Sequence, residues 1–279
     1  MEAFHRCGGD AARCGGAARG AQGERSAREA SESLHQGSVG EHAEDDECYG
    51  DLFAPEPELA LHERQWLPQR LHGSFPPLMF EQNVILWDSS TLVAKWLLER
   101  ELLHPGSISG RSVAELGAGG GLPSLACALA GASSVVCTEV DEIALLAIAR
   151  AAEYNARLLE HEGLKRLQVL RLDWFASLAS DALPAFAPVE LLICADCNYY
   201  ERASSPLVAT IKLVLAPGGT LLLASRLGRH GLALCLALLE ADDEMQMREE
   251  ICFEARGDQS CDSNVLEPQD RMWRYTRSK

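Results

Sequence analysis

Apolar and polar residues follow one another from residue 84 onward in an order that predicts strands and helices in turn. Short apolar runs are typical of buried strands, and longer segments with apolar residues three or four apart are typical of helices. The predicted strands are 112–116, 134–139, 167–172, 189–195 and 220–225, and the predicted helices are 88–103, 122–130, 141–160, 206–215 and 231–240. Two more strands, near 246–254 and 271–277, are expected to pair antiparallel.

Strands that alternate with helices indicate the fold class, which is α/β with a doubly wound, mostly parallel sheet of seven strands and an antiparallel strand at the C-terminal end. The first helix has three candidate N-caps in Asp88, Ser89 and Ser90, and a His-Pro-Gly sequence at His104 ends it. A Pro-Gly-Gly turn at Pro217 is expected before the strand at 220–225.

The N-terminal part of the chain differs in composition. Residues 1–47 are poor in large apolar side chains and cannot bury enough surface to offset the entropy of ordering them. We therefore predict a disordered low-complexity tail at 1–47 and one domain at 48–279, with loops and a short edge hairpin before residue 84. Arginine and serine in the tail leave organelle targeting open, although targeting peptides are poor in acids and this tail is not.

The charge of the chain narrows the choice of partners. The net charge is −16, and nine acids lie between Glu41 and Glu63 without a lysine or arginine. This acidic run is interpreted as a solvated tail, with attraction of a basic partner as the alternative. No basic stripe offsets the repulsion from a phosphate backbone, and no apolar run is long enough for a membrane span, so neither nucleic acid nor membrane is expected as a partner. We expect a monomer.

The ten cysteines point to a reducing compartment. Cys127, Cys137, Cys194 and Cys235 lie in apolar segments, where a free cysteine behaves as a small hydrophobe. This use of cysteine favours the cytoplasm over an oxidising compartment. Cys194 and Cys197 form a CxxC pair, but no second pair stands at zinc spacing, so no metal site is predicted.

The first predicted strand of the domain ends in a glycine-rich turn, residues 117–121. In a doubly wound sheet, ligands bind beyond the carboxyl ends of the strands, where glycines allow a close backbone approach. A dinucleotide fingerprint needs a third small residue where this chain has Leu122, and the Walker pattern is absent. The turn alone is therefore a weak signal.

Two carboxylates make that signal more specific. Glu115 lies two residues before the glycines, where a carboxylate is unfavourable beside a phosphate and favourable beside the cations of S-adenosylmethionine. Glu139 ends the second strand, and its two oxygens suit two ribose hydroxyls. The alternative is that both carboxylates only cap neighbouring helices.

The motifs VILWDSSTLVAKWL, VAELGAGGGLPSLACALAGA, VVCTEVD, LDW and LLICADCNYY, taken in this order, resemble the class I methyltransferases of the group often called family 16. The resemblance covers about residues 84–277. It implies a seven-stranded methyltransferase sheet and S-adenosyl-L-methionine as cofactor. It also implies a protein substrate, because many members methylate lysine on other proteins and some methylate histidine.

Site residues follow from the resemblance position by position. It implies a cofactor site that, together with Glu115, consists of Trp87, Gly117, Ala118, Gly119, Glu139, Asp173, Trp174 and Ala195. Asp196 and Tyr199 match the family's Asp-x-x-Tyr and are the candidate catalytic residues, Asp196 to orient an incoming ammonium and Tyr199 to contact the amine. For Trp87 the alternative is core packing, and for Asp196 it is a helix N-cap.

The chain departs from the family between that aspartate and tyrosine. Cys197 and Asn198 replace the usual aliphatic residues, and Tyr200 adds a second ring. These changes affect the identity of the substrate. Three hypotheses follow: a protein lysine methyltransferase, a methyltransferase of protein histidine or of a small molecule, and a non-catalytic interaction module of the same fold.

Overall fold

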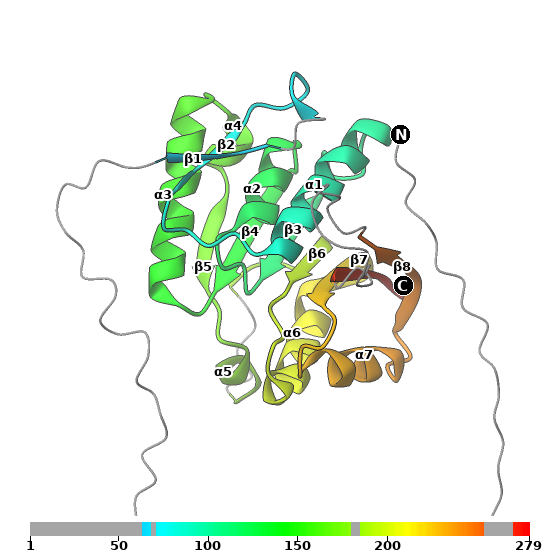
Figure 1. Ribbon diagram of the computed structural model, residues 1–279. Helices are drawn as coiled ribbons and strands as arrows, with labels where there is room; N and C mark the ends of the chain where they lie inside the picture. Colours follow the sequence, from blue (N-terminus) through cyan, green and yellow to red (C-terminus); the bar gives the residue numbers. More distant parts are fainter. Residues whose placement is uncertain (1–62, 68–70, 180–184, 254–269) are drawn as a thin grey trace, which may run out of the picture. The chain divides into compact units, whose positions relative to one another are not determined.

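The computed structural model describes residues 63–67, 71–179, 185–253 and 270–279 (Figure 1). These residues all belong to one compact unit that includes residues 61–279. The predicted tail at 1–47, its boundary at residue 48 and most of the acidic run lie outside the described residues.

The described part of the chain contains a seven-stranded sheet in the order β5-β4-β3-β6-β7-β9-β8. The five strands from β5 to β7 pair in parallel, and β9 pairs antiparallel with both β7 and β8. The strands are β3 (Ser112–Leu116), β4 (Ser134–Glu139), β5 (Gln168–Arg171), β6 (Val189–Ala195), β7 (Leu215–Arg226), β8 (Met245–Cys252) and β9 (Asp270–Arg277). The predicted fold class is therefore confirmed.

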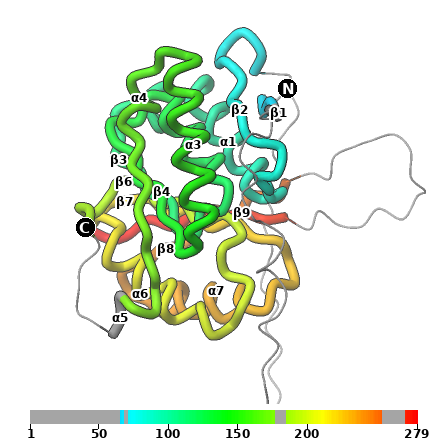
Figure 2. Tube along the Cα trace, turned by 90° about the vertical axis from the view of Figure 1, so that its left-hand side faces the viewer, coloured from blue at the N-terminus to red at the C-terminus, as the bar shows by residue number. Residues whose placement is uncertain are grey.

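Helices cover both faces of the sheet (Figures 1 and 2). The helices α1, α2 and α3 bury apolar side chains in one cluster, and α6 and α7 bury theirs in a second cluster on the other face. The helices are α1 (Asp88–Leu103), α2 (Leu122–Leu129), α3 (Glu142–Leu158), α4 (Glu162–Lys165), α5 (Trp174–Ala179), α6 (Ser204–Val214) and α7 (Leu232–Glu240), with a 3₁₀ turn at Glu201–Ala203. Strands β3, β4 and β6 have the predicted bounds, because their side chains are almost all buried and the apolar run marks them.

The predicted caps of α1 are wrong. Its N-cap is Trp87, which has an extended backbone and makes no side-chain capping bond. The Thr91 N–H donates to the Trp87 carbonyl at 3.0 Å, so the helix begins at Asp88, and both serines lie inside the first turn. Ser89 instead donates to Asp270 Oδ1 at 2.6 Å and ties α1 to β9. The predicted end of the helix at His104 is confirmed.

The Pro-Gly-Gly sequence at Pro217 lies within β7 rather than before it. Val189 pairs with Leu215, and Leu191 then pairs with Thr220, so four residues of β7 lie opposite one residue of β6. Gly218 has a φ of 78° in this irregular segment. The turn-forming residues thus form a bulge, and pairing with β6 resumes beyond it.

Two short helices escaped the sequence pattern because four and six residues are too few to show a helical period. The helices α4 and α5 were not predicted. The expected edge hairpin corresponds to a separate antiparallel pair, β1 (Glu63–Trp66) and β2 (Leu78–Glu81). Asn155 of α3 exchanges two hydrogen bonds of 2.8 Å with the Met79 backbone and holds β2 against that helix. Among the described helices, none has the length and hydropathy that a bilayer crossing requires.

Candidate active site

The carboxyl ends of the parallel strands bring the predicted site residues to one edge of the sheet. Leu116 at the end of β3 pairs with Thr138, and Glu139 at the end of β4 pairs with Arg171. The loop at residues 117–121, the β4 end, the loop before α5 and the segment after β6 therefore start at neighbouring positions on this edge. This is where a doubly wound sheet places its ligand.

The glycine loop has a backbone that side chains would disturb. Gly117 and Gly119 have φ values of 63° and 54°. A Cβ on Gly117 would lie 2.6 Å from Cys197 Cβ and 3.2 Å from the Trp174 ring. Gly117 is thus required both for its left-handed conformation and for the close approach of Cys197 and Trp174.

Glu139 holds the glycine loop. Its Oε2 accepts the Gly119 N–H at 2.9 Å, and its Oε1 accepts the Val140 N–H at 2.7 Å. Oε1 also accepts the Asp141 N–H at 3.3 Å, so the oxygen that keeps a second lone pair for a ligand hydroxyl is Oε2. The structure therefore places Glu139 beside the loop, as the ribose role requires, and that role itself stays a prediction.

Glu115 is fully buried and faces α2. Its Oε2 accepts the backbone N–H of Ser124 at 2.9 Å and the Ser124 hydroxyl at 2.6 Å, so the capping alternative describes this oxygen. Its Oε1 is buried and has no partner among the described residues. Burial raises the pKa of Glu115 to about 8. Direct contact with a cofactor stays a prediction, for which Oε1 is the available atom.

Two tryptophans flank the glycine loop. A Cβ on Gly119 would lie 3.7 Å from Trp87 Cδ1, and Trp87 is 50% exposed, which argues against the core-packing alternative. Trp174 lies against Gly117, as described above. Asp173 immediately precedes α5 and accepts the Phe175 N–H at 2.9 Å, so this contact is with the start of that helix. Ala118 and Ala195 are buried, at the loop and at the end of β6.

Asp196 follows β6 in a left-handed conformation, with a φ of 54°. It does not act as a helix N-cap. Its carboxylate forms a two-pronged ion pair with Arg229, with a Nε to Oδ1 distance of 3.0 Å and a second contact from Nη2 to Oδ2. The Ser225 hydroxyl lies 3.4 Å from Oδ1. Arg229 is a residue that sequence reasoning missed, because nothing local links it to Asp196.

Tyr199 lies on the same edge and is 48% exposed. Its ring makes an edge-to-face contact with Tyr200, with a centroid distance of 4.7 Å. Burial, followed by the negative charge of Glu139, raises the pKa of the Tyr199 hydroxyl. The side chain therefore stays neutral near pH 7 and can both donate and accept a hydrogen bond.

The two residues that depart from the family pattern are structural. Asn198 is buried and donates to the Gly231 carbonyl at 2.8 Å and to the Ser204 hydroxyl at 3.1 Å. It thereby joins the segment after β6 to the start of α7. Cys197 packs against Gly117, and burial raises the pKa of its neighbour Cys194. Within the described ranges, no group of three or more His, Cys, Asp or Glu side chains is arranged to hold a metal ion.

Comparison with known proteins identifies the class. The lysine methyltransferase family model matches residues 81–232, which is more than half of the chain, so the chain belongs to this family. A relative from Cryptococcus neoformans, protein N-terminal and lysine N-methyltransferase EFM7, is 30% identical over 207 residues, covering 66% of this chain and 65% of that protein. Protein N-lysine methyltransferase METTL21A from Xenopus tropicalis is 30% identical over 143 residues, covering 51% of this chain and 60% of its own length. The chain thus spans less than two thirds of these relatives.

Solved structures agree on the fold. SMU.776, a methyltransferase complexed with SAH, superimposes with a TM-score of 0.55 at 13% identity over 80% of this chain and 58% of its own. The 16S rRNA N2 G1207 methyltransferase RsmC of T. thermophilus, in complex with AdoMet and guanosine, gives a TM-score of 0.50 at 20% identity over 81% of this chain and 52% of its own. At these identities the likeness concerns the fold alone.

Proposed function

We propose that this chain transfers a methyl group from S-adenosylmethionine to a lysine side chain of a protein. The observation that carries the proposal is the family match over 81–232, which includes the glycine loop, Glu139, Asp196 and Tyr199 on one edge of the sheet. A fold alone hosts many functions, and these side chains supply the site-level argument.

The residues present fit the cofactor. Gly117 permits an approach that a Cβ would block, and Trp174 and the half-exposed Trp87 offer flat apolar surfaces beside it. Glu139 Oε2 keeps a free lone pair beside the Gly119 N–H that it accepts. The buried Glu115 Oε1 is an acceptor with no partner among the described residues. When bound, S-adenosylmethionine supplies a methyl group on a positively charged sulfur, and the protein needs chiefly to align the acceptor with it.

The acceptor side of the reaction depends on Asp196 and Tyr199. A lysine amine has a free pKa of about 10.4 and has to lose its proton before it attacks. The rings of Tyr199 and Tyr200 can line the path of the incoming side chain, and the neutral Tyr199 hydroxyl can hydrogen-bond the amine. Asp196 lies next to Ala195 at the end of β6 and orients the incoming group.

Label transfer tests the proposal. The chain is incubated with tritium-labelled S-adenosylmethionine and a cell lysate, and labelled proteins are hydrolysed to identify the modified amino acid. A labelled protein band with label in methyllysine is the expected result. Label in methylhistidine or in small molecules would replace the lysine assignment, and no label at all would favour a non-catalytic module.

Asp196→Asn is the matched variant in that assay. Asparagine keeps the size of the side chain but carries no charge and cannot pair with Arg229 as an anion. We expect label transfer to fall by about 10²–10⁴, with cofactor affinity unchanged within about twofold. If Asp196→Asn turns over like the wild type, the catalytic role of Asp196 is refuted.

A second acceptor is a protein α-amine, because EFM7 is named for both N-terminal and lysine methylation. An α-amine has a free pKa of about 7.7–8.0 and loses its proton more readily than lysine. Fragmentation mass spectrometry of the labelled product separates the two acceptors: methyl groups on the α-nitrogen of the N-terminal residue identify the α-amine.

Calorimetry tests the cofactor separately. We expect S-adenosylmethionine and S-adenosylhomocysteine to bind, and NAD to bind far more weakly, because the loop has Leu122 where a dinucleotide-binding loop has its third small residue. Tighter binding of NAD than of either sulfur compound would overturn the cofactor assignment.

The compartment, oligomeric state and partners of the protein are part of the same proposal. We expect a cytoplasmic monomer that acts on a protein, with neither nucleic acid nor membrane as partner. The net charge of −16 and the free buried cysteines support this. Light scattering after size exclusion and cell fractionation are the tests.

A further inference from the structure

The conformation of Asp196 requires an explanation. A residue with a Cβ is disfavoured in the left-handed region, and even aspartate, which adopts it more readily than most, is held there by its surroundings. Part of the fixation comes from the backbone, because the Asp196 N–H donates to the Ala224 carbonyl at 2.8 Å and extends the pairing of β6 with β7. The rest comes from the side chain.

Arg229 holds that side chain from the loop after β7. Its guanidinium contacts both carboxylate oxygens of Asp196, which is the fork geometry in which arginine binds carboxylates most strongly. The Asp196 side chain is only 6% exposed, against 32% for Arg229. The carboxylate therefore has one fixed orientation, and a positive charge lies directly beside it.

We propose that Arg229 is the positioning residue of the methyl-acceptor site, which fixes the Asp196 carboxylate and neutralises its charge without itself contacting the acceptor. The inference rests on the proposed function. A free carboxylate would stabilise the protonated amine and oppose the loss of a proton that methyl transfer needs. Paired with Arg229, Asp196 orients the amine through its remaining lone pairs and stabilises the ammonium far less.

Other ionisable groups lie near this pair. Asp270 and Tyr199 influence Arg229, and Glu139, Tyr200 and Cys197 influence Tyr199. All of them are present in both the wild type and an Arg229 variant. Arg229 also lowers the pKa of Tyr199, so its removal moves that pKa further above its usual value and keeps the hydroxyl neutral. A change in the pH profile of Arg229→Met is therefore attributable to the pair with Asp196 rather than to ionisation of Tyr199.

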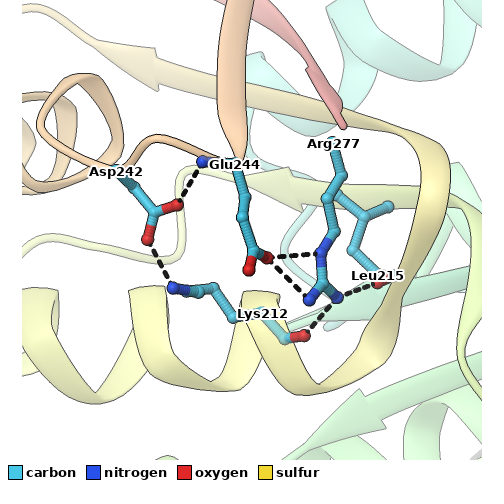
Figure 3. A network of polar contacts seen from close by, with 5 residues as sticks. All are labelled: Lys212, Leu215, Asp242, Glu244 and Arg277. Carbon is cyan, nitrogen blue, oxygen red and sulfur yellow. Dashed lines mark hydrogen bonds and ion pairs between the residues drawn. The ribbon is translucent and has the colours of Figure 1, made fainter. Parts of the chain in front are cut away.

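The chain offers a control at the opposite edge of the sheet, where the end of β9 lies beside the first half of β7. Figure 3 shows its contacts. Arg277 binds Glu244 Oε2 through Nε and Nη2, at 3.0 and 2.8 Å, and also donates to the Lys212 and Leu215 carbonyls. Arg277→Met removes an arginine–carboxylate pair, made here through one carboxylate oxygen, far from the carboxyl ends of the parallel strands. It reports the loss of stability that such a deletion causes by itself.

The experiment compares wild type, Arg229→Met, Arg229→Lys and Arg277→Met in methyl transfer at pH 7.5 and 9.5. For Arg229→Met we expect kcat to fall at both pH values, and the factor by which it falls should be at least ten times larger at pH 7.5 than at pH 9.5. Cofactor affinity should not change. Arg229→Lys keeps the charge but loses the fork, so it should recover the wild-type pH profile with a reduced kcat. Arg277→Met should keep the wild-type ratio between the two pH values.

Hydrogen exchange of the Asp196 amide gives a readout that does not depend on turnover. We expect Arg229→Met to speed this exchange at least tenfold, and Arg277→Met to leave it unchanged. An equal loss of kcat at both pH values, full activity of Arg229→Met, or unchanged Asp196 exchange would each overturn the inference. A wild type that labels no protein would instead remove the proposed function, and the exchange arm would still decide whether Arg229 holds Asp196.

Discussion

Replacing Glu115 with glutamine tests how the buried carboxyl group beneath the glycine loop contributes to stability. Glu115 is fully buried, and burial raises its pKa from 4.5 to about 8. The Ser124 hydrogen bonds and the neighbouring Glu139 shift it less. Between these two pH values, the folded protein binds a proton at Glu115 that the unfolded chain has released.

The sign and size of the effect follow from this difference. Since the folded state holds more protons, the free energy of unfolding falls as the pH rises from about 4.5 to 8, and the full stabilisation is present only below 4.5. One pKa unit corresponds to about 1.4 kcal/mol, so the whole effect is about 5 kcal/mol, of which about 3 kcal/mol falls between pH 6 and 9. Glutamine does not titrate, so Glu115→Gln lacks this component. Its buried amide costs about 1–3 kcal/mol at every pH.

Urea unfolding at pH 6 and pH 9 without cofactor measures the effect. Between pH 6 and pH 9, the free energy of unfolding of the wild type should fall by about 3 kcal/mol more than that of Glu115→Gln. Glu162→Gln is the control, because Glu162 is exposed and Lys165 lowers its pKa. The free energy of unfolding of Glu162→Gln should change between pH 6 and 9 as that of the wild type does. Parallel pH dependences of wild type and Glu115→Gln would refute the reasoning.

Further variants separate the roles of the loop residues. Gly117→Ala should lower the free energy of unfolding by more than about 1–2 kcal/mol, the cost of a left-handed alanine, and should weaken cofactor binding, because its Cβ meets Cys197. Gly218 has a similar φ but no contact closer than 3.7 Å, so in urea unfolding Gly218→Ala should show only the left-handed cost. Equal losses for the two glycines would mean that the Cys197 contact relaxes freely. Glu139→Ala should weaken S-adenosylhomocysteine binding by about 10- to 100-fold in calorimetry. Asp141→Ala should instead cost a helix cap worth about 1 kcal/mol and leave binding unchanged, and similar affinities for both variants would remove Glu139 from the cofactor site.

The sequence by itself determined the parallel core of this protein. Strands β3, β4 and β6 could be predicted to the residue because most of their side chains are buried and they read as short, mainly apolar runs between polar turns. The same pattern placed the glycine loop and Asp196 at strand ends, and parallel pairing brings such ends together. These features depend on residues close together in the chain, which is the information that periodicity carries.

Only the tertiary structure decided how the site is held. Arg229 reaches Asp196 across 33 residues, and Ser89 bonds Asp270 across 181 residues in place of the cap expected of it. The bulge at Pro217 likewise depends on its pairing with β6, because a Pro-Gly-Gly sequence fits a turn equally well. Hydrogen bonds and ion pairs between segments distant in sequence leave no periodic trace along the chain. They become visible only when the folded sheet brings those segments to one edge.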